Sequence, residues 1–269
     1  MVLMLPAVAS VLALADQRLP SGGHVHSGGV EQAVTDGVVR DVATLEAFLA
    51  RRLRTAGLVA AGIAAAACAR AEAPPELARL DAAADARTPS PAQRAASRAQ
   101  GRGLLRLAAT AWPAPSPHVA WAALGARPHH AVVLGCAAHA AGAHPEGAAL
   151  VAAYLAVSGP ATAAQRLLAL DPLAVAAATL RLGEDVERVA AAHRNLHDQH
   201  QVAGGTTVPT VPNVPAATTA ATTTGTATAA ATTGVDHASF GDELPDDSDP
   251  LLDLLAERHA SREERLFAS

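Results

Sequence analysis

Residues 41–71 read DVATLEAFLARRLRTAGLVAAGIAAAACARA, which is the pattern of a long helix with a buried face. Four large apolar residues recur at spacings of three and four and therefore share one helical face: Val42, Leu45, Leu49 and Leu53. Asp41 or Thr44 can cap the start, and Pro74 and Pro75 end the pattern. We therefore expect one long helix over 42–71.

The composition extends this expectation to the whole chain. Hydrophobic residues make up 50% of the 269 residues, whereas aromatic residues make up only 2%, so a core must be built from Ala, Leu and Val. Ala and Leu favour helix, and residues that favour strands are scarce. The sequence therefore predicts an all-α fold, with a single helical-bundle-like domain over residues 1–202.

Capping residues, prolines and apolar spacing place the other elements of this domain. Further helices are predicted at 3–15, 31–39, 90–111, 129–141, 146–157, 162–170, 172–182 and 184–200. Residues 81–88 are predicted to be a polar connection, and Gly159-Pro160 a break between two helices. The apolar start is expected to be a core helix rather than a signal peptide, because no Arg precedes it.

The last quarter of the chain has a different composition. From Gly204 to Gly234 the sequence consists almost entirely of Thr, Ala, Gly, Val and Pro, with almost no charge and no periodic apolar face. Such a segment cannot bury enough surface to offset its chain entropy. We therefore predict a disordered Thr/Ala-rich linker over 203–249, followed by a short helical tail over 250–269.

Charge and residue usage exclude several classes of protein. The sequence has no lysine, so it cannot form an ordinary P-loop or a Schiff base. A net charge of −5 argues against nucleic acid as a partner. The two cysteines, Cys68 and Cys136, lie in Ala-rich helical stretches and favour free thiols in a reducing cytosol. We found no uncharged apolar run of the ~18 residues that a membrane span needs.

Residues 15–31, ADQRLPSGGHVHSGGVE, form a Gly-rich loop between two predicted helices. The glycines permit backbone conformations that other residues disfavour, and His24 and His26 lie between the flanking carboxylates Asp16 and Glu31. One interpretation is a structural turn whose histidines bond to nearby backbone. Another is a metal site, for which the spacing alone is weak support.

This loop closely resembles the N-terminal motif of UreF proteins, with Asp16-x-x-Leu19-Pro20-x-Gly22-Gly23-x-x-His26-Ser27-x-Gly29-x-Glu31. Residues 97–105, SRAQGRGLL, resemble the central arginine-bearing helix of that family, and residues 265–269, RLFAS, resemble its C-terminal signature. His24 stands where the family usually has Tyr or Phe, and the long linker is also a departure from the family pattern.

The resemblance implies an all-helical cytoplasmic accessory protein that forms a homodimer within a larger complex and binds UreD (also called UreH). That pair would recruit the GTPase UreG and help insert nickel into apo-urease, with nickel as transient cargo and no tightly bound cofactor. Partner-binding residues carried over by position are Pro20, Gly22, Gly23, His24, His26, Ser27, Glu31, Arg265, Leu266 and Phe267.

A second feature is independent of the family. Arg94, Arg98, Arg102 and Arg106 recur every four residues and form one basic ridge on a helix. The ridge is either a solvated face with acidic neighbours or a docking surface for an acidic partner, since Arg pairs with carboxylates in bidentate fashion. We assign Arg98 and Arg102 to partner binding as a hypothesis.

A third feature is His193, His197 and His200, whose spacings of four and three place them on one helical face. This geometry can hold Zn²⁺ or Ni²⁺, but it also suits a polar helix end, where protonated His favours the helix dipole. The three residues are therefore weak metal candidates.

Motifs typical of enzymes are absent from the sequence: it has no G-x-S-x-G, H-E-x-x-H, C-x-x-C or G-x-G-x-x-G. We therefore predict that the chain is not an enzyme. The alternatives are a helical adaptor of another assembly pathway and, after it, a small helical enzyme that uses His26 and Glu31.

Overall fold

The computed structural model describes residues 8–20, 26–113, 119–193, 244–262 and 265–267, and these residues contain helices but no strands. The described elements are α1 (Val8–Ala15), α2 (Val30–Thr35), α3 (Val42–Arg52), the π-helical η2 (Leu53–Gly57), α4 (Leu58–Ala69), α5 (Pro74–Ala86), α6 (Pro91–Ala111), the 3₁₀ turn η3 (Trp121–Leu124), α7 (His130–Ala140), α8 (Pro145–Leu168), α9 (Pro172–Arg181), α10 (Gly183–Ala191) and α13 (Pro250–Ala260). The predicted all-α fold class is confirmed.

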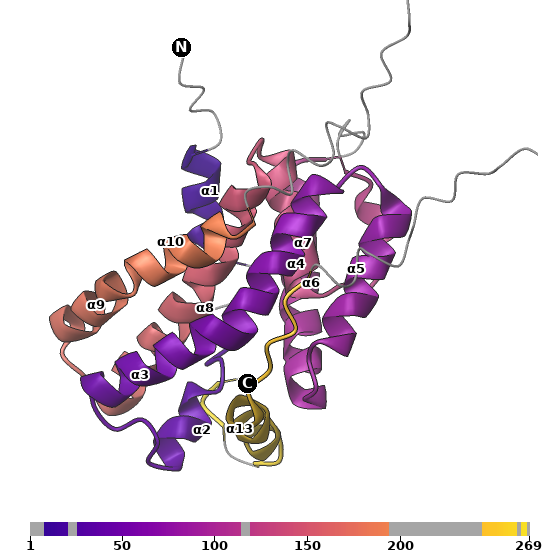
Figure 1. Ribbon diagram of the computed structural model, residues 1–269. Coiled ribbons are helices and arrows are strands. Elements are labelled where there is room, and N and C mark those ends of the chain that lie inside the picture. The colour runs from indigo at the N-terminus through magenta and orange to yellow at the C-terminus, as the bar shows by residue number, and fades with distance from the viewer. Residues whose placement is uncertain (1–7, 21–25, 114–118, 194–243, 263–264, 268–269) are drawn as a thin grey trace, which may run out of the picture.

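Helices α4, α7 and α8 form the centre of the bundle, and the other helices surround them (Figure 1). Their facing surfaces are lined by small residues, so the helix backbones approach closely. A Cβ built on Gly135 of α7 would lie 2.3 Å from the carbonyl oxygen of Ala64 on α4. Only glycine fits at this crossing, and the helices pack closely although the core has few aromatic residues, among them Phe48 and Trp121.

The long helix predicted over 42–71 is confirmed as the continuous run α3–η2–α4, Val42 to Ala69. Asp41 caps it, and the side chains of Asp41 and Thr44 form a reciprocal capping box. By length and composition, the run Val42–Ala69 and helix α8 could each span a membrane. Of the most apolar part of each, 61% is buried inside the bundle, which accounts for the apolar composition.

Two predicted interruptions are wrong. Most of the predicted connection at 81–88 lies within α5. Pro74 and Pro75 end the preceding helical pattern, but they also form the first turn of α5, a position that proline favours. The break at Gly159-Pro160 is absent, since α8 runs through Pro160. Proline cannot donate a bond to the carbonyl four residues earlier, and Arg52 Nε donates to that carbonyl, Ala156 O, at 3.2 Å.

The C-terminal segment packs against the bundle. Residues 244–249, which we assigned to the linker, include the buried side chains of Leu244 and Asp249. Helix α13 then contacts α2 and α6 (Figure 1). The described part of the tail is therefore held against the helical body, and residues 203–243 of the predicted linker lie outside the described residues.

Candidate functional site

The N-terminal motif turns sharply into α2. Ser27 is fully buried, and Gly28 and Gly29 have φ values of +60° and +88°. A side chain at Gly28 would be strained at this φ, and its Cβ would lie 2.8 Å from Cγ of Pro160. The turn is therefore pressed onto α8, which fixes the direction in which α2 leaves it.

The turn places Glu31 where it binds the C-terminal signature. Glu31 is 4% exposed, and its two carboxylate oxygens accept from the backbone N–H groups of Leu266 at 2.9 Å and Phe267 at 3.0 Å. His259 Nε2 lies 3.7 Å from the same carboxylate. Two motifs that the sequence identified separately thus meet in one contact, which we call the tail junction.

The electrostatics of the tail junction depend on burial. Burial lowers the pKa of His259, although the neighbouring Glu31 charge acts to raise it. The imidazole is therefore mostly neutral near pH 7, and the backbone N–H groups are the main hydrogen-bond donors to Glu31. Charge-assisted bonds of this kind are stronger than neutral ones.

Further polar contacts hold the tail beside α2 and α8. Arg258 pairs with Asp36 at 2.8 Å, and Arg262 donates to Thr35 Oγ1 at 3.0 Å. The guanidinium of Arg166 lies 5.7 Å from the centre of the Phe267 ring, a cation–π distance.

The first turn of α13 is anchored as well. Asp249 is buried, caps α13 through Leu251 N, and pairs with Arg51, whose Nη2 lies 2.7 Å from Oδ1. The hydrogen bond from Arg51 is the largest cause of the lowered pKa of Asp249. Glu257 accepts from the Ser90 hydroxyl and from Ala92 N, which links α13 to the start of α6.

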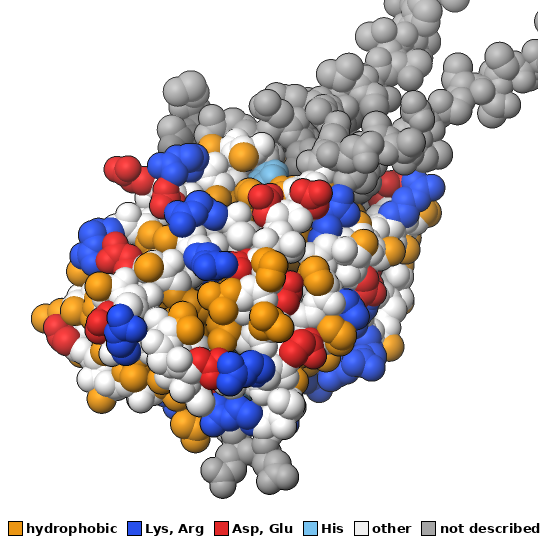
Figure 2. Space-filling view, turned by 60° about the horizontal axis from the view of Figure 1, so that its bottom comes forward, with side chains coloured by type: hydrophobic (Ala, Val, Ile, Leu, Met, Phe, Trp, Pro, Cys, Tyr) orange, Lys and Arg blue, Asp and Glu red, His pale blue; other side chains and the backbone are white. Residues whose placement is uncertain are grey.

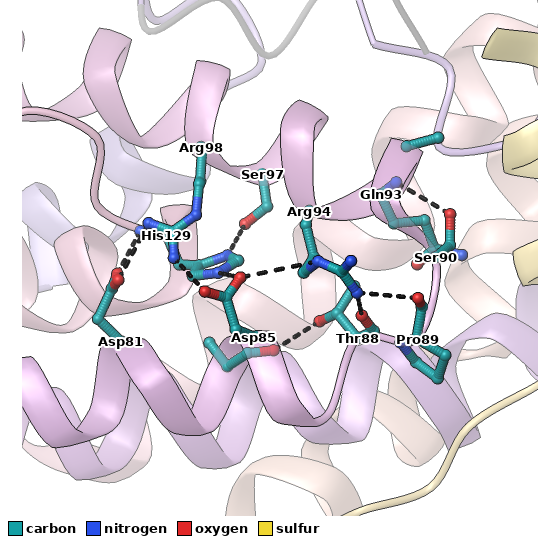
Figure 3. Close-up of polar contacts among 12 residues, drawn as sticks. Asp81, Asp85, Thr88, Pro89, Ser90, Gln93, Arg94, Ser97, Arg98 and His129 are labelled. Atoms are coloured by element: carbon teal, nitrogen blue, oxygen red, sulfur yellow. Dashed lines mark hydrogen bonds and ion pairs between the residues drawn. The ribbon is translucent and has the colours of Figure 1, made fainter.

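The basic ridge of α6 divides into two halves. Arg98 is 21% exposed, and its two Nη nitrogens bind Asp81 at 3.0 Å and Asp85 at 2.6 Å (Figure 3). Arg94 Nη1 donates to the carbonyls of Thr88 and Pro89. These two arginines hold α6 to the α5 region. Arg102 and Arg106 are exposed, and neither forms an ion pair with a described residue.

His129 completes the network around Arg98. Its Nε2 donates to Asp85 Oδ1 at 2.8 Å, its Nδ1 lies 2.9 Å from Ser97 Oγ, and its backbone N–H donates to Asp81 (Figure 3). Burial acts to raise the pKa of Asp85, but bonds from His129 and Arg98 outweigh it and leave the pKa lowered. The structure thus gives Arg98 a structural position between helices, unlike Arg102.

The remaining predicted residues are placed as follows. Pro20 and Arg265 are exposed, Leu266 is 81% exposed, His26 and Phe267 are partly buried, and Gly22, Gly23 and His24 lie outside the described residues. His193 is buried beside α4, where burial lowers its pKa. His197 and His200 lie outside the described residues, so the histidine triad stays a prediction. Among the residues described, no three His, Cys, Asp or Glu form a metal-binding cluster.

Charges of both signs are scattered over the face shown in Figure 2. Sequence reasoning missed His259, Arg166 and Arg52. It also missed Asp81 and Asp85, although their spacing of four residues would have placed them on one face if α5 had been extended through them.

The fold and the tail junction define an all-α bundle in which an N-terminal glycine turn binds the C-terminal end. A sequence model described as UreF matches residues 39–183. The chain is 46% identical to the urease accessory protein UreF of Mycolicibacterium vanbaalenii over 98% of this chain and 99% of the relative. It is 46% identical to that of Mycobacterium marinum over 97% and 99%, and 44% identical to that of Mycobacterium tuberculosis over 98% and 99%.

The chain belongs to the UreF family of urease accessory proteins. The resemblance seen in the sequence is thereby confirmed. The family is one of accessory proteins and not of enzymes, as the sequence predicts.

Proposed function

We propose that this chain is a cytoplasmic scaffold of urease maturation, which acts as a homodimer with UreD/UreH and the GTPase UreG to insert nickel into apo-urease. Nickel is cargo in this proposal, and the chain holds no resident cofactor. Family membership supports the proposal, because the relatives carry the name of urease accessory protein over nearly their full length.

The observation that carries the proposal is the presentation of Leu266. Its backbone N–H is fixed by the buried carboxylate of Glu31, yet its side chain is 81% exposed. Burying an exposed apolar side chain against another protein is favourable in free energy. Because the backbone of Leu266 is already held in place, binding would cost little further conformational entropy. Partner binding at the tail junction therefore combines the N-terminal motif and the C-terminal signature in one surface.

Co-purification with UreD/UreH tests this surface. We expect Leu266→Asp to abolish or strongly weaken capture, because a carboxylate would have to be desolvated in the interface. Leu173→Asp is the matched control, since Leu173 is 80% exposed on α9, outside the junction. Equal capture by both variants and the parent chain would remove the junction from the proposed interface.

Function is tested in a host that lacks its own copy of this gene. The parent chain should restore nickel-loaded, active urease, and Leu266→Asp should not, while the Leu173→Asp variant should. Full urease activity in the host without any copy would contradict the proposal.

A further inference from the structure

The family assignment gives no role to a cavity beside the glycine turn. This cavity has a volume of about 410 Å³ and lies between the turn and helices α3, α6, α7 and α8. Its described polar lining includes His26, Arg52, Gln100, His130 and Arg166. The volume lies in the range of small-ligand pockets, ~300–1,000 Å³.

Positive charge dominates the described lining. Its one carboxylate is Asp16, and Asp16 is neutralised by Arg18, whose Nη2 lies 2.7 Å away. Arg52 and Arg166 remain, and no described carboxylate forms an ion pair with either. The cavity therefore carries an excess of cationic groups.

Arg52 is the central group, because it also lines a neighbouring cavity of about 200 Å³, together with Gln100 and His130. Carboxylates border that second cavity, but one of them, Asp249, is paired with Arg51. Burial alone lowers the pKa of Arg52 to about 10. A partly buried guanidinium without an opposite charge is unfavourable.

The structural bond of Arg52 leaves most of its donors unused. A guanidinium has five N–H groups, and Arg52 uses Nε to bind Ala156 O at 3.2 Å. Neither Nη nitrogen has a hydrogen bond to a described residue. Two parallel Nη donors match a carboxylate or phosphate.

His130 adds a group that can respond to an anion. Burial, followed by the charge of the neighbouring His26, lowers its pKa to about 4, so the ring is neutral near pH 7. An anion beside it would favour the protonated form and raise that pKa. Gln100 supplies an uncharged amide donor in the same lining.

We propose that this cavity binds a small oxyanion, a carboxylate or phosphate group, held by the Nη donors of Arg52 and by Gln100, next to His130. The proposal concerns the ligand class of the cavity and does not depend on which proteins dock at the tail junction. It does not use the tail contacts of Glu31 or Leu266.

The test uses the purified full chain and ¹H–¹³C NMR of the His130 ring, assigned by comparison with His130→Gln. Sodium phosphate or sodium acetate replaces sodium chloride at constant ionic strength. We expect saturable shifts of the His130 signals with at least one oxyanion, and a His130 pKa that rises by about one unit or more. The stronger of the two probes identifies the better-matched oxyanion. Absent or non-saturating shifts with both probes would overturn the proposal.

Variants then locate the site. We expect Arg52→Gln to weaken binding at least about tenfold, whereas Arg102→Gln, at an exposed arginine on α6, should bind like the parent chain. Because Arg52 also supports α8, Gln100→Leu is the second variant, with an expected weakening of about threefold or more. Circular dichroism verifies that each variant is folded. The assignment is refuted if folded Gln100→Leu binds the oxyanion like the parent chain and Arg52→Gln, provided that it folds, does so as well.

Discussion

Replacing Glu31 by Gln should release the C-terminal end while leaving the bundle folded. The two carboxylate oxygens accept from Leu266 N and Phe267 N. Glutamine keeps one acceptor oxygen, but its NH₂ group faces the second N–H donor. One charge-assisted bond is therefore lost, which costs about 2 kcal/mol of local stability.

This free-energy cost predicts a measurable increase in the rate of amide exchange in the tail. Each ~1.4 kcal/mol is a tenfold change in an equilibrium constant, so local opening of the tail should rise about 30-fold. Hydrogen–deuterium exchange followed by mass spectrometry should show that much faster exchange in peptides covering residues 250–267. The central helices α4, α7 and α8 should exchange as in the parent chain.

Glu46→Gln is the matched control. Glu46 is a glutamate of helix α3, and its carboxylate accepts a hydrogen bond from Nε of Arg181 on α9 at 3.0 Å. This contact does not involve the tail. It should leave exchange in 250–267 unchanged. If Glu31→Gln kept the tail as protected as in the parent chain, Glu31 would not hold the tail, and the reasoning would be wrong.

Three further predictions concern the packing of the bundle. Arg98→Ala should lower the free energy of unfolding in urea by about 2 kcal/mol, because Asp81 and Asp85 each lose one of their partners. Arg102→Ala should change it by less than about 0.5 kcal/mol, and equal effects of the two variants would contradict the division of the ridge. Gly135→Ala should lower the free energy of unfolding by about 3 kcal/mol in the same assay, because its Cβ would lie 2.3 Å from the Ala64 carbonyl oxygen. An unchanged urea midpoint would refute the close crossing of α4 and α7. Asp249 has a pKa lowered from 3.8, so its stabilisation of α13 is present above pH 3.8 and is lost as the pH falls through the folded value. The protection factor of the α13 peptide, which corrects for the slower intrinsic amide exchange in acid, should therefore fall in acid in the parent chain, and less so in Asp249→Asn.

The fold class could be predicted because it follows from local properties. Ala and Leu content set the helical preference, and short-range caps such as Asp41 and Ser90 set helix starts within a residue or two. The break predicted at Pro160 failed for a tertiary reason. A proline normally leaves a carbonyl unpaired, but here a side chain from another helix, Arg52, pairs with it.

The site was predictable only in pieces. Resemblance identified Glu31 and Leu266 as separate motif residues, and no local pattern could show that they touch across 235 positions of sequence. The arginine spacing on α6 correctly predicted one face. It could not show that Arg98 has partners, because Asp81 lay in a segment interpreted as a connection rather than a helix.

The bond from Arg52 to the carbonyl left open by Pro160 has an evolutionary consequence. Position 160 tolerates proline because position 52 supplies the missing donor, so the effects of substitutions at the two sites should be non-additive. Replacing Pro160 by an ordinary helix former would supply the backbone bond and make the loss of arginine less harmful. In relatives, the two positions should therefore tend to change together.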